Sequence, residues 1–353
     1  MNALKEHSIQ LLQQLIATES FSENEGGTAR HLKDWCNVHG IQYEEIGHTV
    51  WATNKHYSPD KPTLLLNSHH DTVRPNKAYT RDPFEATIED GKLFGLGSND
   101  AGGALVSLLA TFTHFYVATD LSHNLLFVGS VEEETAGSKS LRGILKDLPS
   151  VDLALVGEPT LLDMAIAEKG LLVFDGTIKG TPSHAAHPNA NNPIMKLPEV
   201  LAWFSNYTFD RESPVLGPVK MTVTQIAAGS QHNVVPSQVK LVVDVRVNDQ
   251  YNNAELADLL QKEAPCELTP RSLHLESSAI SKTHPLVQAG IALGRKTYGS
   301  PTLSDQAALK CPSLKMGPGD SQRSHSADEF IYVAEIEQAI DLYIALLNQF
   351  LYT

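Results

Sequence analysis

The chain has 353 residues, enough for two domains that each bury a core. Its 27 Lys and Arg residues against 41 Asp and Glu residues give a formal net charge of −14, which argues against nucleic acid or an anionic membrane surface as a partner. The three cysteines are far apart, so they predict neither a disulfide framework nor a thiolate zinc site. We expect a cytoplasmic protein, because the sequence shows no signal-peptide pattern and no run of about 18 apolar residues.

The first half of the chain alternates helix and strand patterns. In chain order, the expected elements are helices near 4–18 and 27–39, strands near 41–46, 49–54 and 63–68, a small-residue helix over 102–113, a strand near 125–130, a helix near 138–147 and a strand near 153–156. This alternation predicts an α/β fold with a mostly parallel sheet and flanking helices.

The pattern changes after Gly170. The elements expected there are strands near 171–179, 220–226 and 239–246 and helices near 193–205 and 253–263, which together suit an α+β domain with two helices on one antiparallel sheet. The α/β pattern of the first half then returns, with helices expected near 285–297 and 334–350. We therefore predict a catalytic domain in two parts, residues 1–169 and 281–353, interrupted by a smaller α+β domain over residues 170–280.

Groups of His, Asp or Glu residues follow the strand-like runs, where an open α/β sheet usually places its chemistry. His69 and Asp71 come first. Two positions apart on an extended chain they point the same way, so one can bind a metal while the other supports it. Asp100 follows, in the run Gly-Leu-Gly-Ser-Asn-Asp. The third glycine of a dinucleotide-binding loop is missing there, which argues against a nucleotide site.

Three consecutive glutamates, Glu132 to Glu134, directly follow the expected strand near 125–130. Such a run is either a solvated surface or, at the carboxyl end of a strand, a place to hold a divalent cation. Glu158 closes the next strand in Gly-Glu-Pro-Thr, and His325 lies in a loop that begins Gly-Pro-Gly-Asp-Ser. Two histidines and several carboxylates are nitrogen and oxygen donors that suit zinc, cobalt or manganese.

In this order, the motifs His-x-Asp, Gly-x-Gly-x-x-Asp, Glu-Glu-Glu-Thr, Gly-Glu-Pro-Thr and Gly-Pro-Gly…His-x-x-Asp-Glu resemble those of a co-catalytic dinuclear zinc family of aminoacylases and metallopeptidases. That family includes acetylornithine deacetylase, succinyl-diaminopimelate desuccinylase and carboxypeptidase G. The resemblance extends over essentially the whole chain. It implies a zinc-exopeptidase-like catalytic domain, a dimerisation domain over residues 170–280, a homodimer, and two divalent metal ions, Zn²⁺ with Co²⁺ or Mn²⁺ as alternatives.

The resemblance also implies a ligand set. One metal ion would be bound by His69 and Glu158 and the other by Glu134 and His325, while Asp100 matches the carboxylate that bridges both ions.

Two further residues of these motifs match catalytic roles. Asp71 would orient the imidazole of the first ligand from behind, and Glu133 matches the general base. The glutamate run also allows a register shifted by one. We choose the register with Glu133 as base because Thr135 then follows the pair, as it does in acetylornithine deacetylases. His70 falls on a variable position of the family and is not expected to bind metal.

The inserted domain carries its own match. The run Gly-Thr-Pro-Ser-His-Ala-Ala-His resembles the family's dimerisation motif, in which a histidine reaches the neighbouring subunit's active site and stabilises the oxyanion; that histidine corresponds to His184. Asn233 and Arg246 match residues that hold the substrate carboxylate, a role for which the planar guanidinium fork of arginine is suited. Without this resemblance, the residues alone would indicate a surface turn residue for His184 and an ordinary strand-edge charge for Arg246.

The implied activity is metal-dependent hydrolysis of the N-acyl amide of an amino acid. The motifs look most like those of the deacylases of ornithine-type amino acids, which makes N-acetyl-L-ornithine, hydrolysed for arginine biosynthesis, the expected substrate. N-succinyl-L-ornithine, N-acetylcitrulline and N-acetyl-lysine are alternatives, as is a dipeptidase or carboxypeptidase activity. A binding protein that kept the fold without catalysis would lack a ligand or the base, and every one of them is present.

Overall fold

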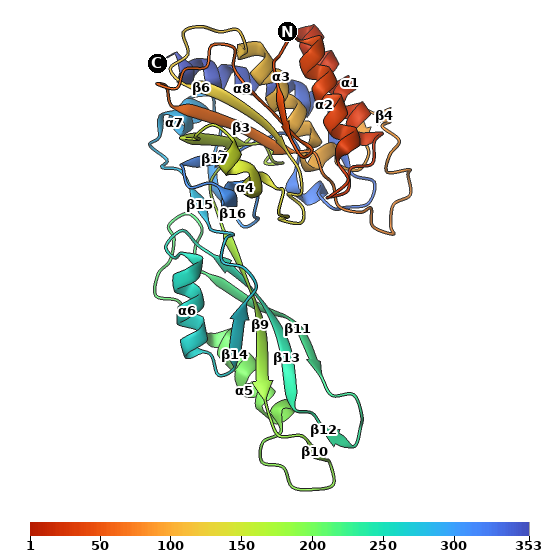
Figure 1. Cartoon of the computed structure of the whole chain (residues 1–353), viewed down its shortest axis with the longest axis vertical. Helices are drawn as coiled ribbons and strands as arrows, with labels where there is room; N and C mark the ends of the chain where they lie inside the picture. Colours follow the sequence, from red (N-terminus) through yellow and green to blue (C-terminus); the bar gives the residue numbers. More distant parts are fainter. Residues whose placement is uncertain (353) are drawn as a thin grey trace. The chain divides into compact units, whose positions relative to one another are not determined.

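The computed structural model describes residues 1–352 and divides into two compact units (Figure 1). Unit 1 comprises Met1–Ile166, Ala279–Tyr298 and residues 304–352, and unit 2 comprises Ala167–Ser278 and Gly299–Leu303. Unit 1 is an α/β unit and unit 2 an α+β unit, so the predicted fold class is confirmed.

Within residues 1–352, unit 1 is organised around a mixed nine-stranded sheet with the order β1-β2-β6-β3-β7-β17-β8-β15, to which β16 adds by pairing with β8. The strands are β1 Glu44–Ile46, β2 Thr49–Thr53, β3 Thr63–His69, β6 Asn124–Ser130, β7 Leu153–Val156, β8 Met164–Glu168, β15 Ser278–Ala279, β16 Thr297–Ser300 and β17 Ser313–Lys315. The central strands β6, β3, β7 and β17 run parallel. Their carboxyl ends therefore meet at one edge of the sheet.

Both faces of the central sheet are buried. Leu64 and Leu66 of β3 belong to the larger core cluster, and Leu65 between them belongs to a second cluster, because successive side chains of a strand point to opposite faces. This explains why β3 is apolar without interruption. The larger core is closed by helices α1 Asn2–Ile16, α2 Gly26–Val38, α3 Gly103–Phe115, α7 Pro285–Ala292 and α8 Val333–Leu351, and the smaller one by the short α4 Leu141–Ile144.

Two predicted helices are shorter than expected. The helix expected near 138–147 is the four-residue α4 followed by a 3-10 turn, Leu145–Asp147. The helix expected near 285–297 ends at Ala292, because Gly294 takes a left-handed conformation (φ +81°) and stops it, and Thr297–Ser300 then forms β16. The remaining part of unit 1 is a small antiparallel sheet of β18 Phe330–Tyr332, β5 Lys92–Phe94 and β4 Ile88–Glu89.

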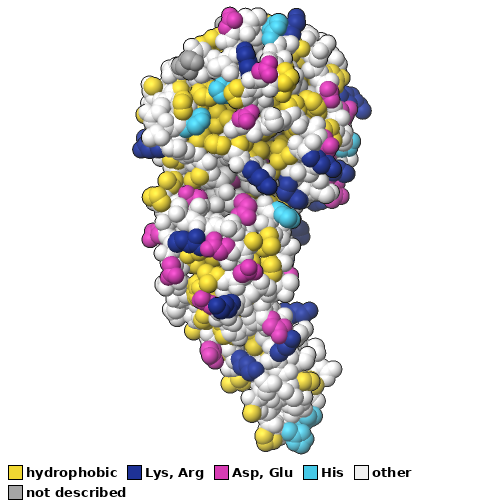
Figure 2. Space-filling view, turned by 60° about the vertical axis from the view of Figure 1, so that its left-hand side comes forward, with side chains coloured by type: hydrophobic (Ala, Val, Ile, Leu, Met, Phe, Trp, Pro, Cys, Tyr) yellow, Lys and Arg dark blue, Asp and Glu magenta, His cyan; other side chains and the backbone are white. Residues whose placement is uncertain are grey.

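Unit 2 contains a four-stranded antiparallel sheet with the order β11-β13-β9-β14. Its elements are β9 Gly170–Lys179, β11 Lys220–Ala228, β13 Gln238–Val247, β14 Glu267–Pro270, α5 Pro193–Asn206 and α6 Asn253–Glu263. Alternate residues of β9 and β13 pack under α5 and α6, as the period-two pattern predicts. A short antiparallel pair, β10 Ser183–His184 and β12 Val234–Val235, lies at one end of the unit, where histidine side chains gather on the surface (Figures 1 and 2). No helix within residues 1–352 is long and apolar enough to cross a bilayer.

Candidate metal centre and active site

The carboxyl ends of the parallel strands deliver most of the predicted site. β3 ends at His69, β6 leads into the glutamate run, and β7 leads to Glu158. Asp100 lies in a turn, Ser98–Gly102, that directly precedes α3. Gly97 opens this turn with φ +75°, and a Cβ there would lie 2.6 Å from Thr72 Cγ2, so glycine is required to bring the Asp100 carboxylate in.

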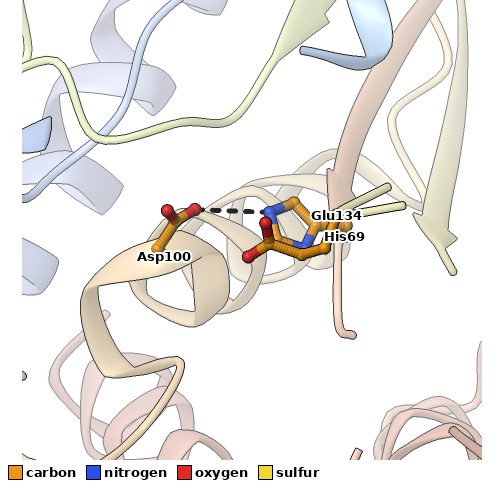
Figure 3. Close-up of side chains that lie close together, drawn as sticks. All are labelled: His69, Asp100 and Glu134. Atoms are coloured by element: carbon orange, nitrogen blue, oxygen red, sulfur yellow. Dashed lines mark ion pairs between the residues drawn. The ribbon is translucent and has the colours of Figure 1, made fainter. Parts of the chain in front are cut away.

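His69 faces the carboxylate of Asp100, with Glu134 beside its ring (Figure 3). Its Nδ1–H donates to the backbone carbonyl of Asp71 at 3.0 Å, which leaves Nε2 facing the acidic side chains. Three carboxylate oxygens surround Nε2: those of Asp100 at 3.4 Å, Glu158 at 3.7 Å and Glu133 at 4.0 Å. Nε2 is buried and has no hydrogen-bond partner among the described residues. A buried nitrogen with a fixed orientation and no partner is what a metal ligand requires.

His325 closes the other side of the cluster. Its Nε2 lies 3.1 Å from Glu134 Oε2 and 3.5 Å from Asp100 Oδ2. Asp100 therefore has one carboxylate oxygen toward His69 and the other toward His325, the placement expected of a bridging ligand. The imidazole of His325 is 54% exposed, whereas that of His69 is 1% exposed, so the centre opens to solvent at His325.

Asp71 is almost fully buried behind the cluster. Its carboxylate accepts the backbone N–H groups of Glu133 at 3.1 Å and Glu134 at 3.2 Å and the Ser22 hydroxyl at 2.7 Å. The imidazole of His69 lies slightly farther away, 3.4 Å from Asp71 Oδ1. Asp71 therefore holds the two glutamates in place as well as facing the His69 ring.

The neighbours of these residues point elsewhere. Glu132 turns away from His69: its Oε2 accepts the backbone N–H of Lys139 at 2.9 Å. His70 is buried between the Thr28 hydroxyl, 2.8 Å from Nδ1, and the His48 carbonyl, which accepts from Nε2 at 3.2 Å. The structure thus brings Glu133 and Glu134 to the cluster and leaves Glu132 and His70 outside it.

Burial and mutual repulsion shift the ionisation of the cluster. Burial, together with Asp100, raises the pKa of Glu158 to about 8, and burial raises the pKa of Glu133 well above its usual range. Burial alone would lower the pKa of His69, but Asp100 and Asp71 hold it well above its usual value. The hydrogen bond to Glu134 raises the pKa of His325 to about 9. An excess of carboxylates so close together calls for positive charge.

The donor set fits divalent cations. Two groups place their ligand atoms within 4.8 Å of one another: His69 with Asp100 and Glu134, and His69 with Glu133 and Glu158. Imidazole nitrogen and carboxylate oxygen are the ligands that zinc, cobalt and manganese accept. The unpartnered Nε2 of His69 and the surplus of carboxylates both agree with cations at this place.

Two buried carboxylates of the site were not predicted. Glu329, 1% exposed, accepts backbone N–H groups from the turn that carries Asp100. Asp305 accepts the Ser130 hydroxyl at 2.6 Å, and burial raises its pKa to about 6. The signal for Glu329 was its position in the His-x-x-Asp-Glu run; Asp305 follows no strand-like run that would have singled it out.

The predicted residues of the inserted domain lie in unit 2. His184 is exposed on β10; its Nδ1 accepts the backbone N–H of Ala186 at 3.1 Å. Asn233 is also exposed, and its carbonyl accepts the N–H of Ala185, which brings the two predicted residues side by side. Arg246 lies on β13 and donates to both oxygens of Asp244 at 2.9 and 3.0 Å.

Comparison with known proteins decides the family. Residues 65–349 match the family described as Peptidase family M20/M25/M40. The chain belongs to this family. It is therefore a metal-dependent M20 hydrolase of the amidohydrolase and peptidase kind, and the cluster around His69 is its candidate metal site. The resemblance drawn from the motifs is confirmed at this level.

Relatives within the M20 family carry different substrate names. Succinyl-diaminopimelate desuccinylase 2 of Ruegeria sp. (strain TM1040) is 25% identical over 378 residues, covering 97% of this chain and 94% of its own length. Acetylornithine deacetylase of Erwinia tasmaniensis is 28% identical over 375 residues, covering 97% of both chains. At these identities the relatives do not distinguish an acetyl from a succinyl substrate.

Solved M20 structures share the fold over the whole chain. The metallo-carboxypeptidase Sso-CP2 of Sulfolobus solfataricus superimposes with a TM-score of 0.74 at 19% identity and 99% coverage of both chains. The YXEP protein of Bacillus subtilis, described as a dinuclear metal-binding peptidase, gives 0.75 at 16% identity with the same coverage.

Proposed function

We propose that this M20 enzyme hydrolyses the N-acyl amide of an amino acid, with N-acetyl-L-ornithine as its substrate and L-ornithine and acetate as products, a reaction of arginine biosynthesis in the cytoplasm. The observation that carries the hydrolytic part is the convergence of His69, Asp100 and His325 with three glutamates at one edge of the sheet. The acyl group and the amino acid rest on the motifs and on relatives such as the acetylornithine deacetylase of Erwinia tasmaniensis.

The proposed ligands are His69 and Glu158 for one ion and Glu134 and His325 for the other, with Asp100 shared. The distances support the bridge, since Asp100 faces one histidine with each carboxylate oxygen. Glu134 lies 3.1 Å from His325, as two ligands of one ion would. Zn²⁺ is the proposed ion, with Co²⁺ or Mn²⁺ able to occupy the same donors.

When bound, two divalent cations supply the positive charge that lowers the pKa of water toward about 7 and polarises the amide carbonyl. Glu133 accepts a proton from the attacking water and returns it to the departing amine. Burial raises the pKa of Glu133, which favours its acceptance of a proton. Asp71 keeps Glu133 in place by accepting its backbone N–H at 3.1 Å.

Unit 2 supplies the proposed substrate-holding groups. We propose that the chain forms a homodimer in which His184 serves the active site of the neighbouring subunit and donates a hydrogen bond to the developing oxyanion. Asn233, beside it, and Arg246 hold the substrate carboxylate. Asp244 supports this role for Arg246, because two hydrogen bonds from the guanidinium fix its plane while its side chain stays 33% exposed.

A second candidate is the removal of a succinyl group, favoured by relatives such as the desuccinylase of Ruegeria. The test is a panel on the full chain loaded with Zn²⁺ or Co²⁺. It compares kcat/KM for acetylornithine, succinylornithine, acetylcitrulline, acetyl-lysine, succinyl-diaminopimelate and simple dipeptides. The highest value for acetylornithine supports the proposal. A higher kcat/KM for a succinyl or peptide substrate would mean that this compound, and not acetylornithine, is the substrate. If the metal-loaded enzyme hydrolyses none of these amides, the proposed function is overturned.

The base is tested separately from the metal ions. Glu133→Gln should bind as many metal ions as the unsubstituted chain while kcat falls by about 10²- to 10⁴-fold, the usual contribution of a positioned acid–base group. Glu132→Gln is the matched control, because this neighbour faces Lys139 and not the cluster. Turnover of Glu133→Gln at the level of the control contradicts the assignment.

A further inference from the structure

Glu329 is a buried carboxylate without a cationic partner. It is 1% exposed, and the ion pairs of the nearby Arg323 and His325 within residues 1–352 are made with Glu335, Asp100 and Glu134. Its oxygens accept three backbone N–H groups instead: Oε1 accepts those of Asn99 at 2.8 Å and Asp100 at 2.9 Å, and Oε2 accepts that of Gly97 at 3.2 Å. A carboxylate buried in this way stabilises the backbone that surrounds it, because each N–H would otherwise lack a strong acceptor.

The backbone held by Glu329 is the turn that delivers Asp100. The N–H of Asp100 itself donates to Glu329, and the carboxylate of Asp100 lies between the His69 and His325 rings, 3.4 and 3.5 Å from them. The N–H that Glu329 accepts and the carboxylate belong to the same residue, Asp100. A displacement of the turn therefore moves both carboxylate oxygens of Asp100 together.

The residues next to Glu329 tie the His325 loop to another segment. Asp328 accepts the backbone N–H and the hydroxyl of Thr80 at 2.8 and 2.6 Å and the N–H of Arg81 at 3.0 Å. Asn76 donates to the backbone carbonyl of His325 at 3.1 Å. One end of the 325–329 run is thereby fixed to the 76–81 segment and the other end to the turn of Asp100.

We infer that Glu329 is a positioning residue of the metal centre, which sets the distance between the bridging carboxylate of Asp100 and the His325 side chain by accepting the N–H groups of Gly97, Asn99 and Asp100. The inference rests on the proposed two-metal function. Groups that orient metal ligands typically contribute about 10- to 100-fold to metal affinity. Glutamine at position 329 keeps the shape but offers one acceptor oxygen, and its NH₂ group faces an N–H that it cannot accept.

The test measures metal binding by the full chain, freed of metal and titrated with Zn²⁺ against a competing chelator. Glu329→Gln should lower the affinity for at least one of the two ions by about 10- to 100-fold. Co²⁺ loading should show a changed absorption spectrum. Glu45→Gln is the control, because this exposed glutamate pairs with Lys33 and lies on the edge strand β1, which carries none of the proposed ligands. Wild-type affinity in Glu329→Gln overturns the inference, even if the thermal midpoint of the metal-free protein has fallen.

Glu329→Asp keeps the charge but withdraws the oxygens by one methylene, and it decides the matter if the glutamine variant does not fold. A metal affinity of Glu329→Asp below that of the unsubstituted chain supports positioning, whereas an unchanged affinity overturns it. The two proposals fail differently. If the unsubstituted chain binds no divalent ion, the proposed function is refuted. If the unsubstituted chain and the Glu329 variants bind two ions equally tightly, the inference alone is refuted.

Discussion

Replacing Asp71 by asparagine exchanges one oxygen for an NH₂ group where three donors converge. The two carboxylate oxygens accept the N–H groups of Glu133 and Glu134, one each, and Ser22 donates to the second. An asparagine carbonyl can serve one of the two N–H groups, so its NH₂ faces the other. The loss of one hydrogen bond to a charged group costs about 1.5–3 kcal/mol, and the unsatisfied buried donor costs about 1–3 kcal/mol more. We therefore expect the free energy of unfolding to fall by about 2.5–6 kcal/mol.

The assay is urea unfolding of the metal-free chain together with steady-state kinetics at a temperature where the variant remains folded. We expect kcat to fall by about 10- to 100-fold, because Asp71 holds the segment that carries the proposed base. Asp152→Asn is the matched control: Asp152 accepts the N–H of Thr63 at 2.8 Å, at the opposite end of β3 from the site. Unfolding and turnover of Asp71→Asn equal to those of this control would refute the reasoning.

Three further outcomes follow from the contacts. His70→Ala should destabilise the chain by about 2–4 kcal/mol yet keep the metal stoichiometry, because His70 is buried against Thr28 and not at the cluster; loss of one bound ion would make it a ligand. Removing metal with a chelator should abolish turnover and lower the thermal midpoint, and free Zn²⁺ at 100 times Kd should restore about 2.7 kcal/mol; an unchanged midpoint counts against a metal centre. Burial raises the pKa of Cys36 to about 12, so its thiol should resist alkylation at pH 8 until the chain is unfolded in urea. The Cys36 thiol ionises at a lower pH in the unfolded chain than in the folded one. The free energy of unfolding should therefore fall as pH rises from about 9 to 12.

The chemistry-bearing residues of the centre were predictable because of where the strands end. Parallel strands place their carboxyl ends at one edge of a sheet, and β6, β3 and β7 are neighbours in that order. Residues that follow these strands must therefore come close together, whatever their separation in the chain. His69 and Glu158 illustrate this, since 89 positions separate them and their side-chain atoms lie 3.7 Å apart.

The ends of two helices were less predictable. The helix expected near 285–297 ends at Ala292, because Gly294 takes a left-handed conformation and the chain then pairs with β8 as β16. The apolar pattern of a few residues indicates which side chains can be buried. It does not indicate which strand, distant in the sequence, the segment will pair with.

The supporting acceptors form a different class from the ligands. Glu329 and Asp71 work by accepting backbone N–H groups, and every residue except proline carries one, so their partners leave no trace in the sequence. Exposed His184 is the reverse case. In unit 2 its ring accepts one N–H and contacts His187, a demand that many polar residues would satisfy. Folding of unit 2 therefore gives no reason for a histidine at this place, and the role of His184 in a neighbouring subunit stays a prediction.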